Sequence, residues 1–278
     1  MGNTVLHRGC ALSYSLKGEG PPVLLIQGVG VCGTGWLPQV AGLANDYRCL
    51  SFDNRGVGAS QPVGCPLTVE QMAEDALAIM DAEGWASAHV VGHSLGGLIA
   101  EHIALNARKR VRSLSLLCTF ARGADATKMS AEMMWIGLRT RIGTRRQRRR
   151  AFLELTMPSD YLRSQSIDEL AVRLEPIFGH DLADQPAIVM KQLSAARKYD
   201  ATPRLGDLAG IPTLVVSSRH DLIARPEYGE AIAEKIPGAK FVEIGDAAHG
   251  VTIQKPEEIN RLLRENFASD MTATFART

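Results

Sequence analysis

Strand-length apolar runs alternate with helical patterns along most of this chain, which predicts an α/β fold. Of the 278 residues, 45% are hydrophobic and 22% are charged, and the formal net charge is +1. This composition is ordinary for a globular protein and excludes a disordered chain. Between residues 121 and 202 the alternation stops and no convincing strand is found. We therefore predict a mostly parallel central sheet with helices on both faces and an inserted all-helical lid.

Six apolar runs have the length and composition of buried strands, and four segments have helical periodicity. The predicted strands span residues 23–27, 47–52, 89–92, 113–118, 212–217 and 240–244, and an edge hairpin is expected over 5–17. The predicted helices span residues 68–83, 95–108, 226–236 and 256–267. Thr68 and Gln71 resemble a capping box at the start of the first helix. Residues 270–278 are polar and aperiodic, so we expect a frayed tail.

The domain organisation follows from these elements. Residues 1–120 and 203–278 are predicted to form the core, and residues 121–202 the lid. Three or four helices are expected, near 128–142, 145–157, 168–178 and 186–199, and Pro158, Pro176 and Pro186 punctuate this stretch. A lid between two strands of a parallel sheet would cover the carboxyl edge of the sheet, where ligands bind in such folds.

The clearest chemical signal is the G-x-S-x-G segment from Gly92 to Gly96, which carries Ser94 at its centre. It follows a β-branched strand and opens a helix, and this context is typical of a nucleophile held at a sharp turn. Larger residues two positions to either side would collide with the turn. We therefore predict that Ser94 is a nucleophile; the alternative is a serine in a glycine-rich turn.

A serine hydroxyl needs a base and a group that orients the base. His249 follows the strand at 240–244 by a short loop and Asp221 follows the strand at 212–217, so both are expected at the same sheet edge as Ser94. The order Ser94, Asp221, His249 is that of the α/β-hydrolase triad. Asp246 is expected to be a turn residue, and His93 to point away from the Ser94 side chain. The alternative for Asp221 is a local polar contact with His220.

The backbone N–H groups of Val29 and Leu95 are the predicted oxyanion donors, one in the loop after the first central strand and one directly after Ser94. Residues 28–33 also match G-x-G-x-x-G, the pattern of a dinucleotide-binding loop. Asp53 is the only acidic residue placed to contact a ribose. The Ser, Asp and His set accounts for more of the sequence, so no cofactor and no metal are expected.

These motifs resemble the α/β-hydrolase superfamily over roughly residues 20–120 and 203–268. The matching segments are 27–30, 53–60 and 92–97, together with Asp221 and His249. Within the superfamily the chain is similar to the branch of carboxylesterases, 3-oxoadipate enol-lactonases, C–C bond hydrolases and cofactor-free haloperoxidases. The resemblance implies that Asp53 and Arg55 are structural. Many members have His where this chain has Gln27, so the bracing of the oxyanion loop differs.

The lid contains seven arginines between residues 139 and 150 and no acidic residue. A solvated helix face, a surface for anionic partners or lipid headgroups, and a single arginine that binds a substrate carboxylate all remain open interpretations. The global charge gives no reason to expect a nucleic-acid partner. No apolar run is long enough to span a bilayer. Five scattered cysteines and the absence of a signal-peptide pattern lead us to expect a cytoplasmic protein.

We therefore predict a cofactor-independent serine hydrolase that cleaves a small or medium carboxylic ester or lactone through an acyl-enzyme. The alternatives are a C–C bond hydrolase of a ring-fission diketone, a haloperoxidase or perhydrolase, and a ligand receptor with slow turnover. The sequence does not predict the oligomeric state.

Overall fold

The computed structural model describes residues 2–127 and 130–275. In this part of the chain, eight strands form one sheet in the order β1-β2-β4-β3-β5-β6-β7-β8. The hairpin of β1 and β2 is antiparallel and pairs with β4, and all pairs from β4 to β8 are parallel. The strands are β1 Asn3–His7, β2 Cys10–Lys17, β3 Pro22–Ile26, β4 Arg48–Phe52, β5 Ala88–His93, β6 Val111–Leu117, β7 Thr213–Ser218 and β8 Lys240–Ile244. The predicted mostly parallel sheet and its edge hairpin are confirmed.

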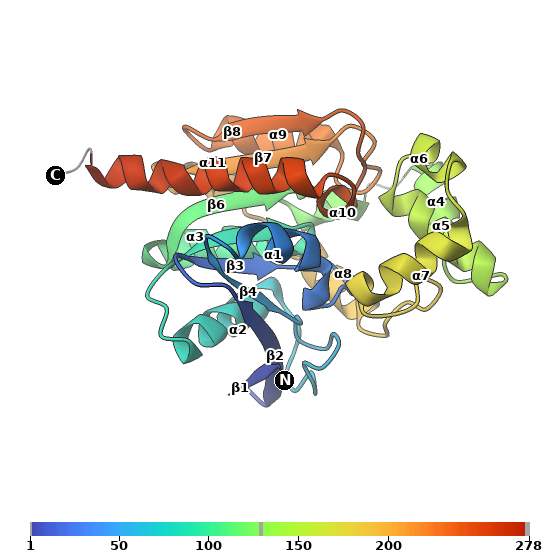
Figure 1. Ribbon diagram of the computed structural model, residues 1–278, viewed down its shortest axis with the longest axis horizontal. Helices are drawn as coiled ribbons and strands as arrows, with labels where there is room; N and C mark the ends of the chain where they lie inside the picture. Colours follow the sequence, from blue (N-terminus) through green and yellow to red (C-terminus); the bar gives the residue numbers. More distant parts are fainter. Residues whose placement is uncertain (1, 128–129, 276–278) are drawn as a thin grey trace.

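Helices cover both faces of this sheet (Figure 1). Helices α2 and α3 pack together on one face, and α1 and α11 pack together on the other. The core helices are α1 Leu37–Leu43, α2 Val69–Ala82, α3 Leu95–Asn106, α9 Pro226–Lys235, α10 Val251–Gln254 and α11 Pro256–Phe275. Thr68 caps α2 by accepting a hydrogen bond from the Gln71 amide at 3.1 Å. No helix among the described residues has both the length and the apolar composition needed to cross a bilayer.

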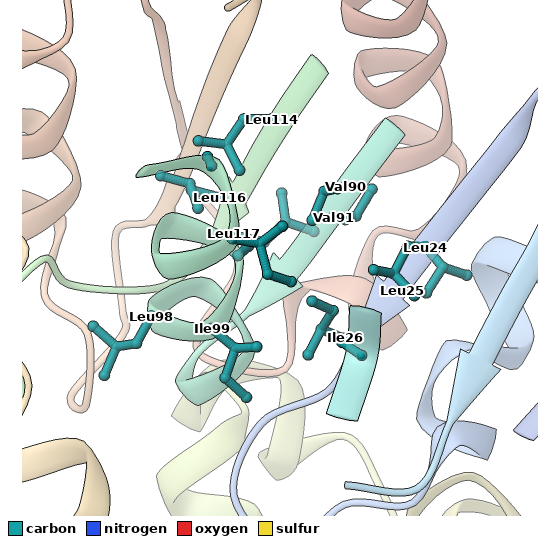
Figure 2. Packing of buried hydrophobic residues seen from close by; sticks show 14 of the residues in the cluster. Leu24, Leu25, Ile26, Val90, Val91, Leu98, Ile99, Leu114, Leu116 and Leu117 are labelled. Atoms are coloured by element: carbon teal, nitrogen blue, oxygen red, sulfur yellow. The ribbon is translucent and has the colours of Figure 1, made fainter. Parts of the chain in front are cut away.

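The main hydrophobic core lies where α3 packs on β3, β5 and β6 (Figure 2). Fully buried aliphatic side chains from these strands meet Leu98 and Ile99 of the helix. Burial of one such side chain stabilises the fold by about 1.5–3 kcal/mol. The carboxyl end of β5, where Ser94 follows, is therefore attached to the main hydrophobic core.

Residues 121–202, which we call the helical insertion, contain five α-helices and no strand longer than a single bridge among the described residues. They are α4 Ala131–Arg139, α5 Arg145–Thr156, α6 Ser159–Arg163, α7 Ile167–Phe178 and α8 Val189–Arg197. Helices α4 to α7 lie together beyond one end of the sheet, drawn in green and yellow in Figure 1. A second hydrophobic cluster, centred on Leu153 and Leu174, holds α5 and α7 together.

The arginines of the insertion pair mainly with acidic residues of the same insertion. Asp181, which is buried, accepts hydrogen bonds from both Arg145 and Arg149. These arginines hold the pKa of the Asp181 carboxyl well below its usual range. Other ion pairs of these arginines are Arg139–Glu154, Arg145–Asp184, Arg146–Asp168, Arg148–Asp184, Arg149–Asp168 and Arg150–Glu154. Most of the arginine run thus connects α5 to its neighbours.

Several boundaries differ from the sequence-based prediction. The helix expected at 168–178 is not among them: it matches α7, which contains Pro176 in its last turn and ends before Gly179, which has a left-handed φ of 80°. A proline in the last turn removes only one intrahelical hydrogen bond, which explains why it is tolerated. The expected frayed tail is wrong for residues 270–275, which belong to α11; residues 276–278, and residues 128–129 of the expected first lid helix, lie outside the described part. Helices α1, α6 and α10 were not predicted.

Candidate active site

Ser94 lies at the turn between β5 and α3, in a backbone conformation that residues other than glycine rarely adopt. Its φ is 54° and its ψ is −120°. Such backbone strain costs about 1–3 kcal/mol and persists only where the surroundings impose it. Here the Ser94 N–H donates to Leu117 O at 3.0 Å, and Ser94 O accepts from Thr119 Oγ1 at 2.7 Å and from the Gly97 amide at 2.9 Å. The end of β6 and the first turn of α3 therefore hold Ser94 in place.

The glycines around Ser94 are required by close backbone contacts. A Cβ at Gly92 would lie 2.2 Å from Gly96 O, and a Cβ at Gly96 would lie 2.1 Å from Ile26 O. Because both clashes involve backbone atoms, no side-chain rotation relieves them. A Cβ at Gly28 would lie 3.1 Å from Ser94 Cβ, so the loop after β3 passes directly beside the serine.

Asp221 and His249 meet at the carboxyl ends of β7 and β8. His249 Nδ1 lies 2.7 Å from Asp221 Oδ2, and both side chains are buried. The other oxygen, Oδ1, accepts hydrogen bonds from the Ile223 amide at 2.7 Å and the Ala224 amide at 2.8 Å. The carboxylate therefore has a fixed orientation, with one oxygen on the backbone and the other on the imidazole. This arrangement keeps a proton on Nδ1 and leaves Nε2 free to accept one.

His93 connects the His249 loop to the strand that ends at Ser94. His93 Nε2 lies 2.8 Å from His249 O, and the two rings are 4.9 Å apart. Burial lowers the pKa of His93 to about 3, so the ring is neutral and its Nε2–H donates to the carbonyl. Ser94 thus directly follows a residue that contacts His249, although within the described residues no hydrogen bond joins Ser94 Oγ to the imidazole. In enzymes without bound substrate such contacts are often long.

The two predicted oxyanion donors have no protein acceptor within the described part of the chain. The Leu95 N–H is at the amino end of α3, where helix amides lack intrahelical partners. In the loop after β3, the Gly28 N–H donates to Gln27 Oε1 at 2.9 Å, whereas the Val29 N–H makes no such bond. Both free amides therefore lie on segments adjacent to Ser94.

Side chains after β4 also hold the loop that follows β3 and carries Val29, the predicted oxyanion donor. Asn54 Nδ2 donates to Gln27 O at 2.9 Å, and Asp53 Oδ1 accepts from the Gly33 amide at 2.8 Å. Arg55 is fully buried and pairs with Asp75. The structural roles expected for Asp53 and Arg55 are confirmed. Since the Asp53 carboxylate is bound to backbone amides, it is not available to a ribose, which argues against a dinucleotide loop.

The other candidate side chains lie outside the group formed by Ser94, Asp221 and His249. Asp246 is exposed and pairs with Lys255, as expected of a turn residue. His220 has an exposed side chain, and its backbone amide donates to Ala247 O at 3.0 Å. Among the described residues, no group of three or more His, Cys, Asp or Glu side chains is placed to hold a metal ion.

One cavity lies at the boundary between the helical insertion and the core. It has a volume of about 270 Å³, and its walls include Met157 and Leu174 of the insertion and Ile253 of α10. Ser94, Asp221 and His249 are not among its lining residues. The cavity is therefore beside the helix that follows His249 and separate from the three side chains.

Comparison with known proteins assigns the family. A family model described as alpha/beta hydrolase fold matches residues 21–256. The chain belongs to the alpha/beta hydrolase fold family. Most of the proteins to which it is similar are named as hydrolases, so the comparison supports hydrolysis as the general type of reaction.

Three relatives cover nearly all of this alpha/beta hydrolase. The chain is 29% identical to a protein of Azorhizobium caulinodans named as the carbamate hydrolase RutD, over 92% of the chain and 95% of the relative. It is 31% identical to a protein of Mycobacterium tuberculosis named as the non-heme bromoperoxidase BpoC, over 93% of the chain and 98% of the relative. The solved structure of an enol-lactonase from Burkholderia xenovorans LB400 superposes with a TM-score of 0.80 at 27% identity, covering 96% of the chain and all of that protein (100%). These names differ in the reaction that they state, so they identify the family but not the reaction or the substrate of this chain.

Proposed function

We propose that this protein is a serine hydrolase that cleaves a small or medium carboxylic ester or lactone through an acyl-enzyme. The observation that carries the proposal is the buried pair of His249 Nδ1 and Asp221 Oδ2 at 2.7 Å, at the same sheet edge as the strained Ser94. Neither feature is needed for packing alone. Together they supply a nucleophile, a base and a group that orients the base.

In the proposed reaction, His249 Nε2 takes the proton from Ser94 Oγ as the oxygen attacks the carbonyl carbon. Asp221 holds the tautomer and stabilises the imidazolium. The Val29 and Leu95 N–H groups bind the oxyanion, and each such donor contributes about 3–4 kcal/mol to the transition state. His249 then protonates the leaving alcohol. A water molecule, activated by the same imidazole, releases the acid from Ser94.

The helical insertion is proposed to act as a lid over this site. Its α8 contacts the oxyanion loop at Gly30, and its Thr156 O accepts a hydrogen bond from the Gly250 amide at 2.8 Å, next to His249. A lid in this position would exclude bulk water and limit the size of the acyl group.

The test is turnover of p-nitrophenyl acetate by the wild type and by Ser94→Ala, with labelling of the protein by a fluorophosphonate. We expect Ser94→Ala to lose nearly all turnover, with thermal unfolding unchanged, and the label to be attached to Ser94 by peptide mass analysis. Ser164→Ala, which removes an exposed hydroxyl in the insertion, is the matched control and should keep full activity. Unchanged turnover in Ser94→Ala, or an adduct on another residue, would contradict the proposal.

The bond that is cleaved is decided by a substrate panel. Esters, enol-lactones, carbamates and ring-fission diketones should be compared by kcat/KM with the same enzyme preparation. We expect esters or lactones to be preferred. A preference for a diketone would indicate a C–C bond hydrolase with the same three residues.

A further inference from the structure

The helical insertion makes a direct hydrogen bond to the loop that carries the Val29 amide. The Gly30 N–H donates to Gln192 Oε1 at 2.8 Å, although 162 residues separate the two. Gln192 belongs to α8 and is fully buried. Val189, one turn earlier, packs on the same loop, because a Cβ at Gly30 would lie 2.8 Å from Val189 Cγ2.

Glutamine side chains hold the peptide groups on both sides of the one that carries the Val29 N–H. The Gly28 N–H is held by Gln27 Oε1 from the core, and the Gly30 N–H is held by Gln192 Oε1 from the insertion. The peptide between them carries the Val29 N–H, which has no acceptor within the described residues. Because peptide groups are planar, fixing the two outer planes limits the rotation of the middle one. The direction of the Val29 N–H therefore depends on both glutamines.

Packing alone does not explain a glutamine at this position. Gln192 Nε2 is buried and has no hydrogen-bond partner among the described residues. A buried amide donor without a partner is destabilising, and a methionine of similar length would fill the same space without such a donor. Within the part of the chain that the structure describes, the bond from the Gly30 N–H to Oε1 is the one hydrogen bond of the Gln192 side chain, and it requires a polar side chain.

We propose that Gln192 is a positioning residue that orients the Val29 amide toward the oxyanion, so that the helical insertion takes part in catalysis. The inference rests on the proposed function above. Gln192 would act through the backbone of Gly30 and would not contact the substrate itself. Its loss would misplace a donor that acts in the transition state, and misplacement of a catalytic group by about 1 Å costs roughly a hundredfold in rate.

The experiment compares Gln192→Met with Thr34→Val. The first change removes the acceptor and keeps the side-chain length. The second removes another hydrogen bond between the same segment and the insertion, Thr34 Oγ1 to Ile177 O at 3.0 Å, without touching peptides 28–30. The readouts are kcat and KM for p-nitrophenyl acetate per site titrated with fluorophosphonate, and the hydrogen exchange of the Gly30 amide in the absence of substrate.

For Gln192→Met we expect kcat to fall by about tenfold or more, KM to change by less than about threefold, and Gly30 exchange to become faster. Thr34→Val should match the wild type in all three. A Gln192→Met enzyme with kcat within about twofold of the wild type, or a kcat loss shared equally by Thr34→Val, overturns the proposal. Gln192→Glu keeps an oxygen acceptor and should keep slow Gly30 exchange; loss of that protection also contradicts the acceptor role.

Different results would refute the proposed function and the proposed role of Gln192. A wild type that neither hydrolyses esters nor reacts with fluorophosphonate at Ser94 refutes the proposed function. In that case the Gly30 exchange, which needs no substrate, still decides whether Gln192 holds the loop. An active, Ser94-labelled wild type with an unaffected Gln192→Met variant refutes only the inference about Gln192.

Discussion

Replacing Asp221 by Asn removes one charge and keeps the shape of the side chain, so it tests whether this group sets the tautomer of His249. Oδ1 of Asp221 accepts two backbone hydrogen bonds, from the amides of Ile223 and Ala224, at 2.7 and 2.8 Å. In Asp221→Asn the amide oxygen must keep this position. The opposite rotamer would place an NH₂ group against two buried N–H donors, at a cost of about 1–3 kcal/mol for each unpaired group.

The Asn NH₂ group is therefore directed at His249 Nδ1, where Asp221 Oδ2 lies at 2.7 Å in the wild type. A donor at this position forces Nδ1 to accept and moves the ring proton to Nε2. A ring protonated at Nε2 does not take the proton from Ser94. In a serine hydrolase this change lowers kcat by roughly 10⁴ while the geometry stays intact. We expect that loss here, together with a Tm close to that of the wild type.

The assay is steady-state hydrolysis of p-nitrophenyl acetate with thermal unfolding of the same samples. Asp246→Asn is the matched control, because Asp246 is close to His249 in sequence but is exposed and pairs with Lys255. It should leave kcat unchanged. If Asp221→Asn keeps more than about a tenth of the wild-type kcat, the tautomer argument is wrong. A large loss in Asp246→Asn instead would transfer the acid role to that residue.

Three further predictions concern stability. Arg55→Met leaves the buried Asp75 carboxylate without its main partner, which costs about 3–5 kcal/mol. For a chain of 278 residues this cost corresponds to a fall in Tm of about 5–9 °C. Arg8→Met, which removes an exposed ion pair, is the control and should change Tm little. Burial raises the pKa of Glu101 well above its ordinary value of 4.5, so the fold loses stability as pH rises above that value; Glu101→Gln should therefore have a higher Tm than the wild type, by a margin that grows from roughly pH 4 to pH 8 in thermal scans. Asp181→Asn removes the carboxylate shared by Arg145 and Arg149, so it should lower Tm near neutral pH. Because the ion pairs lower the pKa of this carboxyl below its ordinary value of 3.8, the Tm difference between the variant and the wild type should shrink as the pH falls below that value. A Tm difference that stays constant from neutral pH into acid would contradict the ion-pair explanation.

The fold was largely predictable because local patterns decide it. The run at 240–244 matches β8 at both ends, and Ser94 sits between a strand and a helix as its glycines require. The errors occurred where local signals are weak or conflict. Helix α1 contains Pro38 and Gly42 and is only 7 residues long, so its pattern is hard to recognise.

The candidate site was predictable to the extent that parallel strands bring their carboxyl ends to one edge. That rule alone placed Asp221 and His249 near each other, and their pairing at 2.7 Å agrees with it. Contacts that depend on side-chain direction could not be found in this way. The bond from His93 to His249 O spans 156 residues and the bond from Gly30 to Gln192 spans 162, and no sequence period relates the partners. Such contacts are determined by how the insertion and the loops pack against each other.

The helical insertion is attached to two of the loops on which the proposed chemistry depends. Gln192 accepts from Gly30 in the oxyanion loop, and Thr156 O accepts from Gly250, the residue after His249. Within the insertion, Asp181 connects α5 to the segment before α8 through Arg145 and Arg149. The two attachment points, at the end of α5 and in α8, are therefore connected by ion pairs as well as by the chain. A displacement of the insertion as a unit would disturb the oxyanion donor and the base together, so loosening either contact should lower kcat before it changes the affinity for substrate.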